Sequence, residues 1–589
     1  MEVDMWLCFV RPSKLFESQL DPKVPGTSME VDGADQRVHN GSGIASLLPA
    51  STRCIMIAEL RLKILDLVAP LVSTVGRLPK FERGMEFKLK FVRKTLLALA
   101  LTCKSFTGPA LDILWRHLGG LEPLIRCLPQ SLWKQDNMKL EFQRTMTLDD
   151  WSIFCKYNYR IHSLVNQFHS SYVNDEMICD IEIWRALSCP PFSFPLLPNL
   201  TSLTWTEASD ETFQYIRLFI TPQLTMLHIH AWSSAFDTFG PSEQSIMSSI
   251  PKSCPSVSNF SLVIDAGQSI RPRDTSTLLQ CWSHLTSVRT EMVSAAGILH
   301  LSSLPSLRVL KFQLPPTPIS AATQRLLQRP AFCALQELDV TCKSLVILKA
   351  FLEKITVAPK VLSFTITHGV DSVRALPASI SHIANGCAHS SLQAVQFSII
   401  NEPVDSNALI EAEAFQPLFA FHNLRKLKFQ AHGHCIVRMD DAALLEMAKA
   451  WPLLEELYII RYGQSSHQVT PNAFVLLLQH CPRLVSVSLT IDWSTIDVHA
   501  IPTEIPCERF SHKALSHVFC AGSRINYPIN IAVFISAIAP NINSIEAWNR
   551  GTHEDDDDLV DSPAWNLVPD STKIFTVVRH QETIMMLMR

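Results

Sequence analysis

The residues of this chain that could do chemistry are histidines and cysteines, which can act as metal ligands, nucleophiles or general bases. Residues 432–435 read HGHC and offer three such side chains in four positions, and His228 and His230 are spaced to share one face of a strand. A structural zinc site needs a second pair of ligands at a regular distance, and none follows HGHC, so this segment is interpreted as a loop. His228 and His230 are interpreted as structural. The sequence therefore predicts no metal site and no cofactor.

Motifs of catalysis are missing from the sequence. It contains no glycine-rich phosphate loop, no GxSxG, no HExxH and no pair of carboxylates in a motif setting. Its 16 cysteines are spread singly without a CxxC pair, which indicates reduced, mostly buried thiols in an intracellular protein, cytoplasmic or nuclear. We therefore predict no catalytic residue. One alternative stays open, a hydrolase on an α/β frame that would combine one of these cysteines with one of the 21 histidines.

Charge and composition restrict the possible partners. The chain has 51 basic and 55 acidic residues and a net charge of −4, which argues against non-specific binding to nucleic acid or to an anionic membrane. No stretch approaches the ~20 apolar residues of a membrane span. Because 47% of the 589 residues are apolar and the chain is too long for one core, the sequence predicts several domains or one extended repeat array.

Three short helices are predicted within residues 46–118, after a polar leader at 1–45 for which we expect disorder. The first covers 57–71, where apolar residues recur at three- and four-residue steps. A basic segment at 76–91 separates it from a second helix at 93–106, and Gly108 and Pro109 precede a third at 110–118. Helices this short make a marginal core, so we expect their apolar faces to serve a partner as well.

The order of these elements resembles an F-box, and it is most similar to the F-box-like modules that precede repeats in fungal proteins. The resemblance rests on ELRLKIL in the first helix, LTCKSF in the second and LDILWRHL in the third, although Met56 and Ile57 stand where the family usually has Leu-Pro. It implies that the module docks on a Skp-type adaptor carried by a cullin scaffold. The residues that it assigns to this contact are Leu60, Ile64, Leu67, Leu101, Cys103, Phe106, Leu114 and Trp115. Plain helix core is the alternative for Leu101, Phe106 and Trp115.

A repeated unit begins near Leu200. Each copy reads apolar, two variable residues, apolar, one variable residue, apolar, and the thirteen copies follow one another at intervals of about 28 residues. In eight copies a proline stands two residues before the leading apolar position, which marks a corner where a helix has ended and a strand begins. The leading positions are Leu200, Leu224, Val257, Leu285, Leu307, Leu335, Val361, Leu392, Leu424, Leu454, Leu484, Leu515 and Ile542.

Helices are predicted between these strands. Thr470 suits an N-cap and Pro471 the first helical position, and Asp440 or Asp441 suits the cap of the preceding helix. One strand and one helix per repeat is the leucine-rich-repeat unit. We therefore predict an α/β repeat fold in which a three-helix F-box-like module precedes a curved leucine-rich-repeat solenoid, with parallel strands on the concave side and helices on the convex side. The expected divisions are a leader at 1–45, the module at 46–118, helical junction and capping repeats at 119–196, the solenoid at 197–550, and an acidic loop with a C-terminal segment at 551–589.

The predicted function follows from the strand face. Residues between the repeated apolar positions face the concave surface, where they form a candidate binding site for a protein target. These candidates are His228, Arg289, Lys311, Glu337, Asp339, Lys426, Lys428, Glu456 and Tyr458. Together with the F-box resemblance, they predict a non-catalytic substrate adaptor of a cullin-type ubiquitin ligase. The alternatives are a repeat scaffold without ligase coupling and the hydrolase named above.

Overall fold

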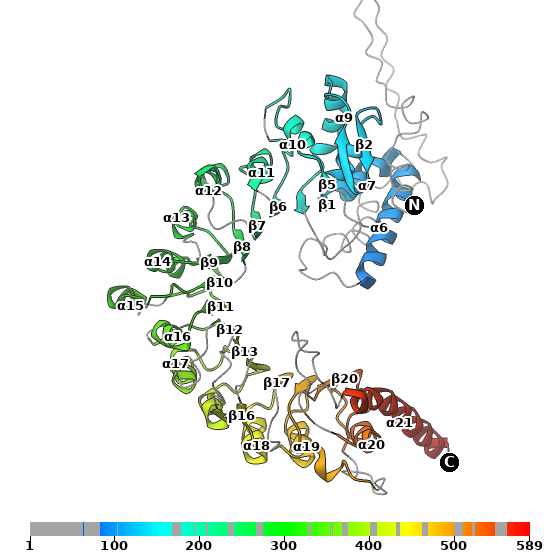
Figure 1. Ribbon diagram of the computed structural model, residues 1–589, viewed down its shortest axis with the longest axis vertical. Helices are drawn as coiled ribbons and strands as arrows, with labels where there is room; N and C mark the ends of the chain where they lie inside the picture. Colours follow the sequence, from blue (N-terminus) through cyan, green and yellow to red (C-terminus); the bar gives the residue numbers. More distant parts are fainter. Residues whose placement is uncertain are drawn as a thin grey trace, which may run out of the picture. The chain divides into compact units, whose positions relative to one another are not determined.

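The computed structural model shows a chain of alternating strands and helices (Figure 1), which divides into two compact units between Arg271 and Pro272. Each unit is described by itself. The described residues are Lys63 and 83–588, with gaps at 103, 168–177, 194, 208–209, 234–240, 267–274, 318, 328–330, 354, 356, 368–374, 401–408, 432–435, 462–468, 500–509, 521–522, 524 and 548–561. The predicted leader, the first helix of the predicted module, the HGHC segment and the acidic run Glu554–Asp558 lie outside the described residues.

The first unit is built on a parallel sheet with the strand order β1-β4-β6-β7-β8. Its strands are β1 (His117–Leu118), β2 (Trp133–Asp136), β3 (Lys139–Phe142), β4 (Ser163–Gln167), β5 (Ile178–Cys179), β6 (Ser202–Glu207), β7 (Met226–Ser233) and β8 (Asn259–Ala266). Its helices are α6 (Arg83–Thr102), α7 (Lys104–Trp115), α8 (Glu122–Arg126), α9 (Leu148–Asn158), α10 (Ile181–Leu187), α11 (Asp210–Phe213), η3 (Gln214–Leu218) and α12 (Pro241–Ser253).

This sheet begins earlier than the expected start near Leu200. A column of buried side chains runs across neighbouring strands in register, and its members are Leu118, Leu164, Leu203, Leu227 and Phe260. The third predicted helix is accordingly too long, because α7 ends at Trp115 and the next residues pair as strand β1. The second predicted helix is too short, because α6 already begins at Arg83, inside the segment expected to be a basic spacer.

Residues 119–196 were expected to be helical and are mixed instead. Strands β2, β3 and β5 form a separate small sheet, in which β2 and β3 are an antiparallel hairpin. Asn137 lies in the two-residue turn of this hairpin with a positive φ of 53°, a conformation that asparagine tolerates better than most residues. Strands β2 and β3 have four residues each, so their alternation of polar and apolar residues is too short to be distinguished from the helical periodicity of the flanking sequence.

The second unit carries a longer parallel sheet, in the order β9-β10-β11-β12-β13-β15-β17-β18-β19-β20, and a separate pair β14-β16. Its strands are β9 (Ser287–Met292), β10 (Val309–Gln313), β11 (Glu337–Cys342), β12 (Val361–Ile366), β13 (Ala394–Ile399), β14 (Leu409–Glu411), β15 (Lys426–Ala431), β16 (Ile436–Arg438), β17 (Glu456–Arg461), β18 (Ser486–Ser488), β19 (His517–Phe519) and β20 (Ser544–Glu546). Its helices are α13 (Ser276–Leu279), α14 (Ala295–Ser303), α15 (Ala321–Leu327), α16 (Leu345–Leu352), α17 (Leu376–Gly386), η5 (Ala412–Ala420), α18 (Asp441–Ala450), α19 (Pro471–His480), η6 (Trp493–Thr495), α20 (Pro528–Ile538) and α21 (Ser562–Met588).

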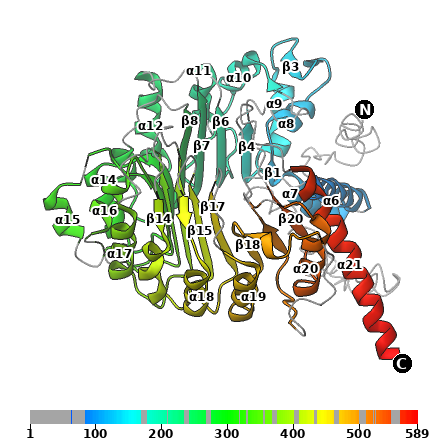
Figure 2. The same ribbon diagram turned by 60° about the horizontal axis from the view of Figure 1, so that its bottom comes forward.

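Strands of the second unit stack in register, with helices along one side of them (Figures 1 and 2). Buried leucine, valine and isoleucine side chains form one column from β10 to β20, and phenylalanines form much of a second. In this second column the rings of Phe364 and Phe397 lie 5.3 Å apart, and those of Phe397 and Phe429 lie 6.5 Å apart. This geometry confirms the prediction of an α/β repeat with stacked parallel strands.

At least seven of the repeats turn into their strands through the same backbone hydrogen bond. The amide of the leading apolar residue donates to the carbonyl three residues earlier, as in a β-turn, and the recurrent proline stands at the second position of this turn, which its fixed φ suits. The pairs are Leu200–Leu197, Leu224–Thr221, Leu307–Leu304, Leu335–Phe332, Leu424–Phe421, Leu454–Trp451 and Leu484–Cys481. The predicted leading positions thus lie two residues before their strands.

One repeat was placed in the wrong register. Val361 was predicted to be a leading residue, but it pairs with Glu337 and Ala394, which are the first residues of their strands. The leading position is therefore held by buried Pro359, which was expected to be a corner proline. The proline ring is apolar, so the side chain at this position is still buried. Because it is not a leucine, the repeat pattern does not identify it as a leading residue.

The predicted helix caps of the second unit are confirmed. The carboxylate of Asp440 accepts from the amide of Ala443 at 2.8 Å, and the Thr470 hydroxyl accepts from the amide of Ala473 at 3.3 Å. Asp441 does not cap its own helix α18. It accepts instead from the amide and the hydroxyl of Thr470, both at 2.7 Å, and so ties α18 to the start of α19.

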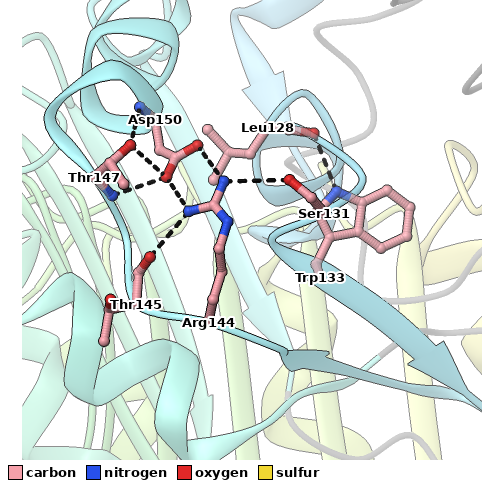
Figure 3. A network of polar contacts seen from close by, with 7 residues as sticks. All are labelled: Leu128, Ser131, Trp133, Arg144, Thr145, Thr147 and Asp150. Carbon is pink, nitrogen blue, oxygen red and sulfur yellow. Dashed lines mark hydrogen bonds and ion pairs between the residues drawn. The ribbon is translucent and has the colours of Figure 1, made fainter.

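A buried carboxylate holds the start of α9 in the first unit (Figure 3). The guanidinium of Arg144 donates to both oxygens of Asp150, at 2.6 and 3.0 Å, and Thr147 forms a reciprocal capping box with the same residue. These hydrogen bonds, led by that from Arg144, lower the pKa of Asp150 to about 2. Because the ordinary value is 3.8, the ionised carboxylate stabilises the fold at any pH above that value.

We expect Asp150→Asn to lower the local stability of α9 by about 2 kcal/mol, because it removes a charge-assisted hydrogen bond pair. In the wild type this contribution should be present above pH 3.8 and be lost as the pH falls towards 2. Hydrogen exchange of the α9 amides measures both effects. The exposed neighbour Asp149 provides the control, and an equal effect of Asp149→Asn would show that only the charge of the first turn matters.

Candidate functional site

Predicted target-binding residues of the second unit lie where the repeat pattern placed them. In each strand they alternate with the buried columns and are half-buried or exposed on the opposite face of the sheet. We call this surface the strand face. It is lined in the second unit by Arg289, Lys311, Glu337, Asp339, Lys426, Lys428, Glu456 and Tyr458.

The strand face has a polar cluster on β15, β17 and β18. Glu456 accepts from Lys426 at 2.6 Å and from Lys428 at 3.0 Å. The Lys428 ammonium also lies 4.8 Å from the centre of the Tyr458 ring, and the Tyr458 hydroxyl is 2.5 Å from that of Ser486. We call these five residues the Lys–Glu–Tyr cluster. Figure 2 shows the neighbouring strands β15, β17 and β18 that carry it.

Parallel pairing explains this cluster. Lys426 lies directly beside Glu456, and Lys428 lies beside Tyr458, because the strands are in register. Burial disfavours the Glu456 carboxylate, but the hydrogen bonds from Lys426 and Lys428 outweigh it and lower the pKa of Glu456. Basic and acidic residues that alternate from repeat to repeat along the sequence thus lie beside each other on neighbouring strands and form ion pairs. Ser486 was not among the predicted residues, because the single hydroxyl of a short strand gives no signal.

The other charged positions of the strand face form a second, looser group on β9, β10 and β11. Lys311 pairs with Asp339 at 3.5 Å, and on its other side it lies beside Arg289. Arg289 and Glu337 are exposed and have no ion pair among the residues that the structure describes. Two neighbouring cations repel each other, so this end of the face keeps charge that a partner could neutralise.

His228 belongs to the first unit. It lies half-buried on β7, between Thr204 of β6 and Ser261 of β8. His230 follows at the next position of the same face. No group of three or more His, Cys, Asp or Glu side chains that could hold a metal ion occurs among the described residues.

The predicted adaptor contacts separate into buried and exposed residues. Phe106, Leu114 and Trp115 are buried between α7 and its neighbours, and the Trp115 ring lies 4.8 Å from that of Tyr157. Leu101 is 53% exposed near the end of α6. The remaining predicted contacts, Leu60, Ile64, Leu67 and Cys103, lie outside the described residues.

Helix α6 presents two faces. Val92, Leu96 and Ala100 are buried at four-residue steps, whereas Phe91 and Leu101 are exposed at 65% and 53%. Phe91 was not predicted as a site residue, because it fell in the segment expected to be a spacer. At 3.6 residues per turn, Phe91 and Leu101 lie about 80° apart around the helix, both on the side away from the buried residues, and no regular spacing relates them.

A buried ionic group fixes α6 against the first repeat. Glu122 of α8 pairs with Arg126 at 2.8 Å, and Arg126 also donates to Gln135 at 3.0 Å. Burial raises the pKa of Glu122, while the nearby cations Arg126 and Arg93 act against that rise. Arg93 belongs to α6, so this charge links the helix pair electrostatically to the repeat that follows.

Three buried thiols and one buried imidazole of the second unit have surroundings that suit a structural role. Burial raises the pKa of Cys342, Cys387 and Cys481 to about 12, which keeps them as protonated thiols. His512 is buried near Cys481, but its Nε2 contacts the Cys481 carbonyl at 3.0 Å and not the thiol. Its Nδ1 accepts from the amide of Leu515 at 3.1 Å, so Nε2 carries the proton and donates.

Comparisons with known proteins add little to this geometry. No family model and no curated protein sequence matches the chain. Similar solved structures include the complex of Rad7 and Elc1 from yeast, at 13% identity and a TM-score of 0.22, over 46% of this chain and 78% of that one. They also include the APL1 leucine-rich repeat domain, at 10% identity and a TM-score of 0.27, over 68% of this chain and 84% of that one. Because both TM-scores are low, the repeat assignment rests on the register of the strands.

We expect His512→Phe to destabilise the second unit by about 2 kcal/mol, because it removes one hydrogen bond between repeats and leaves the Leu515 amide without an acceptor. Burial lowers the pKa of His512 below 6.5, so the wild type should be most stable above pH 6.5 and lose stability as the pH falls from there through the folded-state pKa. Urea unfolding between pH 5 and 8 measures this slope. It should flatten in His512→Phe, while exposed His517→Gln, the control, should keep it.

Proposed function

We propose that this chain is the substrate-recognition adaptor of a cullin-type ubiquitin ligase, which docks on a Skp-type adaptor through its N-terminal helices and holds a protein target on its strand repeats. The observation that carries the proposal is the order of the two surfaces along the chain. A helix pair with two exposed apolar side chains, Phe91 and Leu101, comes first, and a repeat with a polar strand face follows it. This order agrees with the F-box resemblance of residues 46–118.

The docking half of the proposal rests on α6. A phenylalanine and a leucine that are both exposed on the solvent side of a helix are unfavourable in water unless a partner covers them. The buried residues Phe106 and Trp115 hold α7 against the body, so their part is to support this face rather than to touch the adaptor. The contact itself is assigned to Phe91 and Leu101, together with the preceding residues Leu60, Ile64 and Leu67.

The recognition half of the proposal rests on the Lys–Glu–Tyr cluster. Tyrosine and arginine are the side chains that most often dominate protein interfaces, and Tyr458 is half-buried beside the cationic Lys428. The strands β12 and β13 present Ser363 and Gln396 at the same level, both smaller than tyrosine. A polypeptide can therefore lie across these strands against the tyrosine ring.

In this scheme the chain brings a target close to a ubiquitin-charged conjugating enzyme and contributes no reacting group. Ubiquitin transfer would be accelerated by proximity, because an adaptor that holds the target makes its encounter with the conjugating enzyme effectively intramolecular. The protonated thiols and the structural His512 agree with such a role.

Replacing both Phe91 and Leu101 by Asp should lower the amount of co-purified Skp-type adaptor by about tenfold or more, because two charges would enter an apolar contact. Pull-down of the full chain measures this. Leu148→Asp is the matched control, since Leu148 is 74% exposed on α9 of the same unit and outside the helix pair. Undiminished binding by the double variant would contradict the docking face. A wild-type chain that binds no adaptor would instead favour a repeat scaffold without ligase coupling.

Changing Tyr458 and Lys428 together to Ala should remove the bound target and leave the adaptor in place, with a loss in target affinity of about 30-fold or more, as for an interface hot spot. Affinity purification with mass spectrometry under proteasome inhibition reads both partners at once. Lys449→Ala on exposed α18 is the control. If the proteins enriched by the double variant are those enriched by the wild type, the strand face around Tyr458 does not bind the target.

A further inference from the structure

The C-terminal helix α21 has two apolar faces, and only one of them is covered by the rest of the second unit. Trp565, Val568 and Thr572 are buried against α20 and β20, and the Trp565 indole donates to the Ser523 carbonyl at 2.8 Å. Figure 2 shows α21 continuing beyond the end of α20. From Val577 onwards, nearly every described side chain of the helix is at least partly exposed.

The uncovered face is regular. Leu567, Ile574, Val578 and Met585 are exposed by 59%, 63%, 44% and 56% and follow one another at steps of seven, four and seven residues. These steps match the two apolar positions of a heptad, which form the seam between paired helices. Ser571 and Gln581 hold the two remaining seam positions within this stretch. We call these six residues the outer seam.

The outer seam is self-complementary. Read in either direction, it has the order apolar, polar, apolar, apolar, polar, apolar. In an antiparallel pair of two α21 helices, Ile574 would meet Val578, Leu567 would meet Met585, and Ser571 would meet Gln581. All apolar positions then face apolar ones, and the two polar side chains can bond to each other. A two-fold axis requires such an arrangement, in which the same patch serves both copies.

Charge and area also fit a second copy. Between Ser562 and Met588 the sequence contains two acidic and two basic residues, so two copies do not repel each other, and the helix lacks the excess of cations that favours a membrane surface. The exposed aliphatic side chains of the outer seam with Val577 and Ile584 amount to roughly 600 Å² per copy, not far below the about 800 Å² of a standard interface.

We propose that α21 is a dimerisation helix, which pairs antiparallel with the α21 of a second copy through the outer seam. The antiparallel sense follows from the packing. Helix α20 holds α21 as far as Arg579, whose guanidinium donates to the Val533 carbonyl at 3.3 Å, and the described residues beyond Arg579 are exposed. In an antiparallel pair each exposed end meets the packed start of its partner, whereas a parallel pair would bring the two bodies together at one end.

Sedimentation equilibrium of the full chain tests the proposal. The wild type should be a dimer at micromolar concentration, and the combination of Ile574→Glu and Val578→Glu should weaken dimerisation by about 100-fold or more, because it puts four charges into one interface. His580→Glu adds the same kind of charge outside the seam and should leave the dimer intact. If the double variant does not fold, Met585→Glu at the free end of the helix serves in its place. A monomeric wild type, or a dimer that survives these changes, would overturn the proposal.

Cross-linking tests the direction of pairing. A mixture of Leu567→Cys and Met585→Cys chains should form a disulfide between the two different variants under mild oxidation, identified by mass spectrometry of the linked peptides, which also separates it from the exposed native cysteines. A disulfide between two Met585→Cys chains would show that the helices run parallel, and the proposed arrangement would be wrong.

Discussion

The turn at the corner of each repeat is the constraint on which the rest of this structure depends. A helix has to end and a strand has to begin within a few residues, and the amide of the leading leucine satisfies the carbonyl three residues earlier. Proline at the second position of the turn has two effects. It reduces the conformational freedom of the unfolded chain, and it prevents the preceding helix from continuing. Wherever this turn recurs, the next strand starts two residues later and falls into register with its neighbour.

The corners also bond to one another. Trp451 donates from its indole to the carbonyl of Leu418 at 3.2 Å, Cys481 donates from its thiol to the carbonyl of Trp451 at 3.5 Å, and His512 donates from Nε2 to the carbonyl of Cys481 at 3.0 Å. Each of these residues precedes its leading leucine by three positions. Three different side chains thus perform one task, a hydrogen bond to a backbone carbonyl of the preceding repeat. A column of identical residues is not needed when only a donor of suitable length is required.

Register has a direct consequence for the strand face. Because neighbouring residues on that face are fixed by the pairing, Lys426 and Lys428 share the carboxylate of Glu456, which neutralises one of their two charges before any partner arrives. Displacing such pairs gains little net energy, so for the proposed target the aromatic ring of Tyr458 and the exposed charges of Arg289 and Glu337 would contribute more than the paired lysines. In the proposed function the face would therefore select its target through a few residues, although many of its residues are polar.

Periodicity was sufficient to predict the repeat, its corners and its helix caps, since twelve of the thirteen leading positions precede their strands by the same two residues. Val361 was misplaced because Pro359 fills the leading position without being a leucine. Strand β1 was missed for another reason. Two residues, His117 and Leu118, carry no alternation, and only their pairing with β4 makes them a strand. Likewise, which face of α6 is exposed depends on contacts with other elements, and no local pattern contains that information.

The ends of the repeat show why function gathers there. A parallel sheet leaves an unpaired edge at its first and last strand, and such edges attract other chains unless they are covered. In the first unit α7 packs beside β1, and in the second unit α21 packs beside β20. A covering helix needs one apolar face for the sheet, and its other face is free to vary. Helix α6, the partner of α7, exposes Phe91 and Leu101, and α21 exposes the outer seam. The helices near the edges of the sheets are thus well placed for the contacts proposed above.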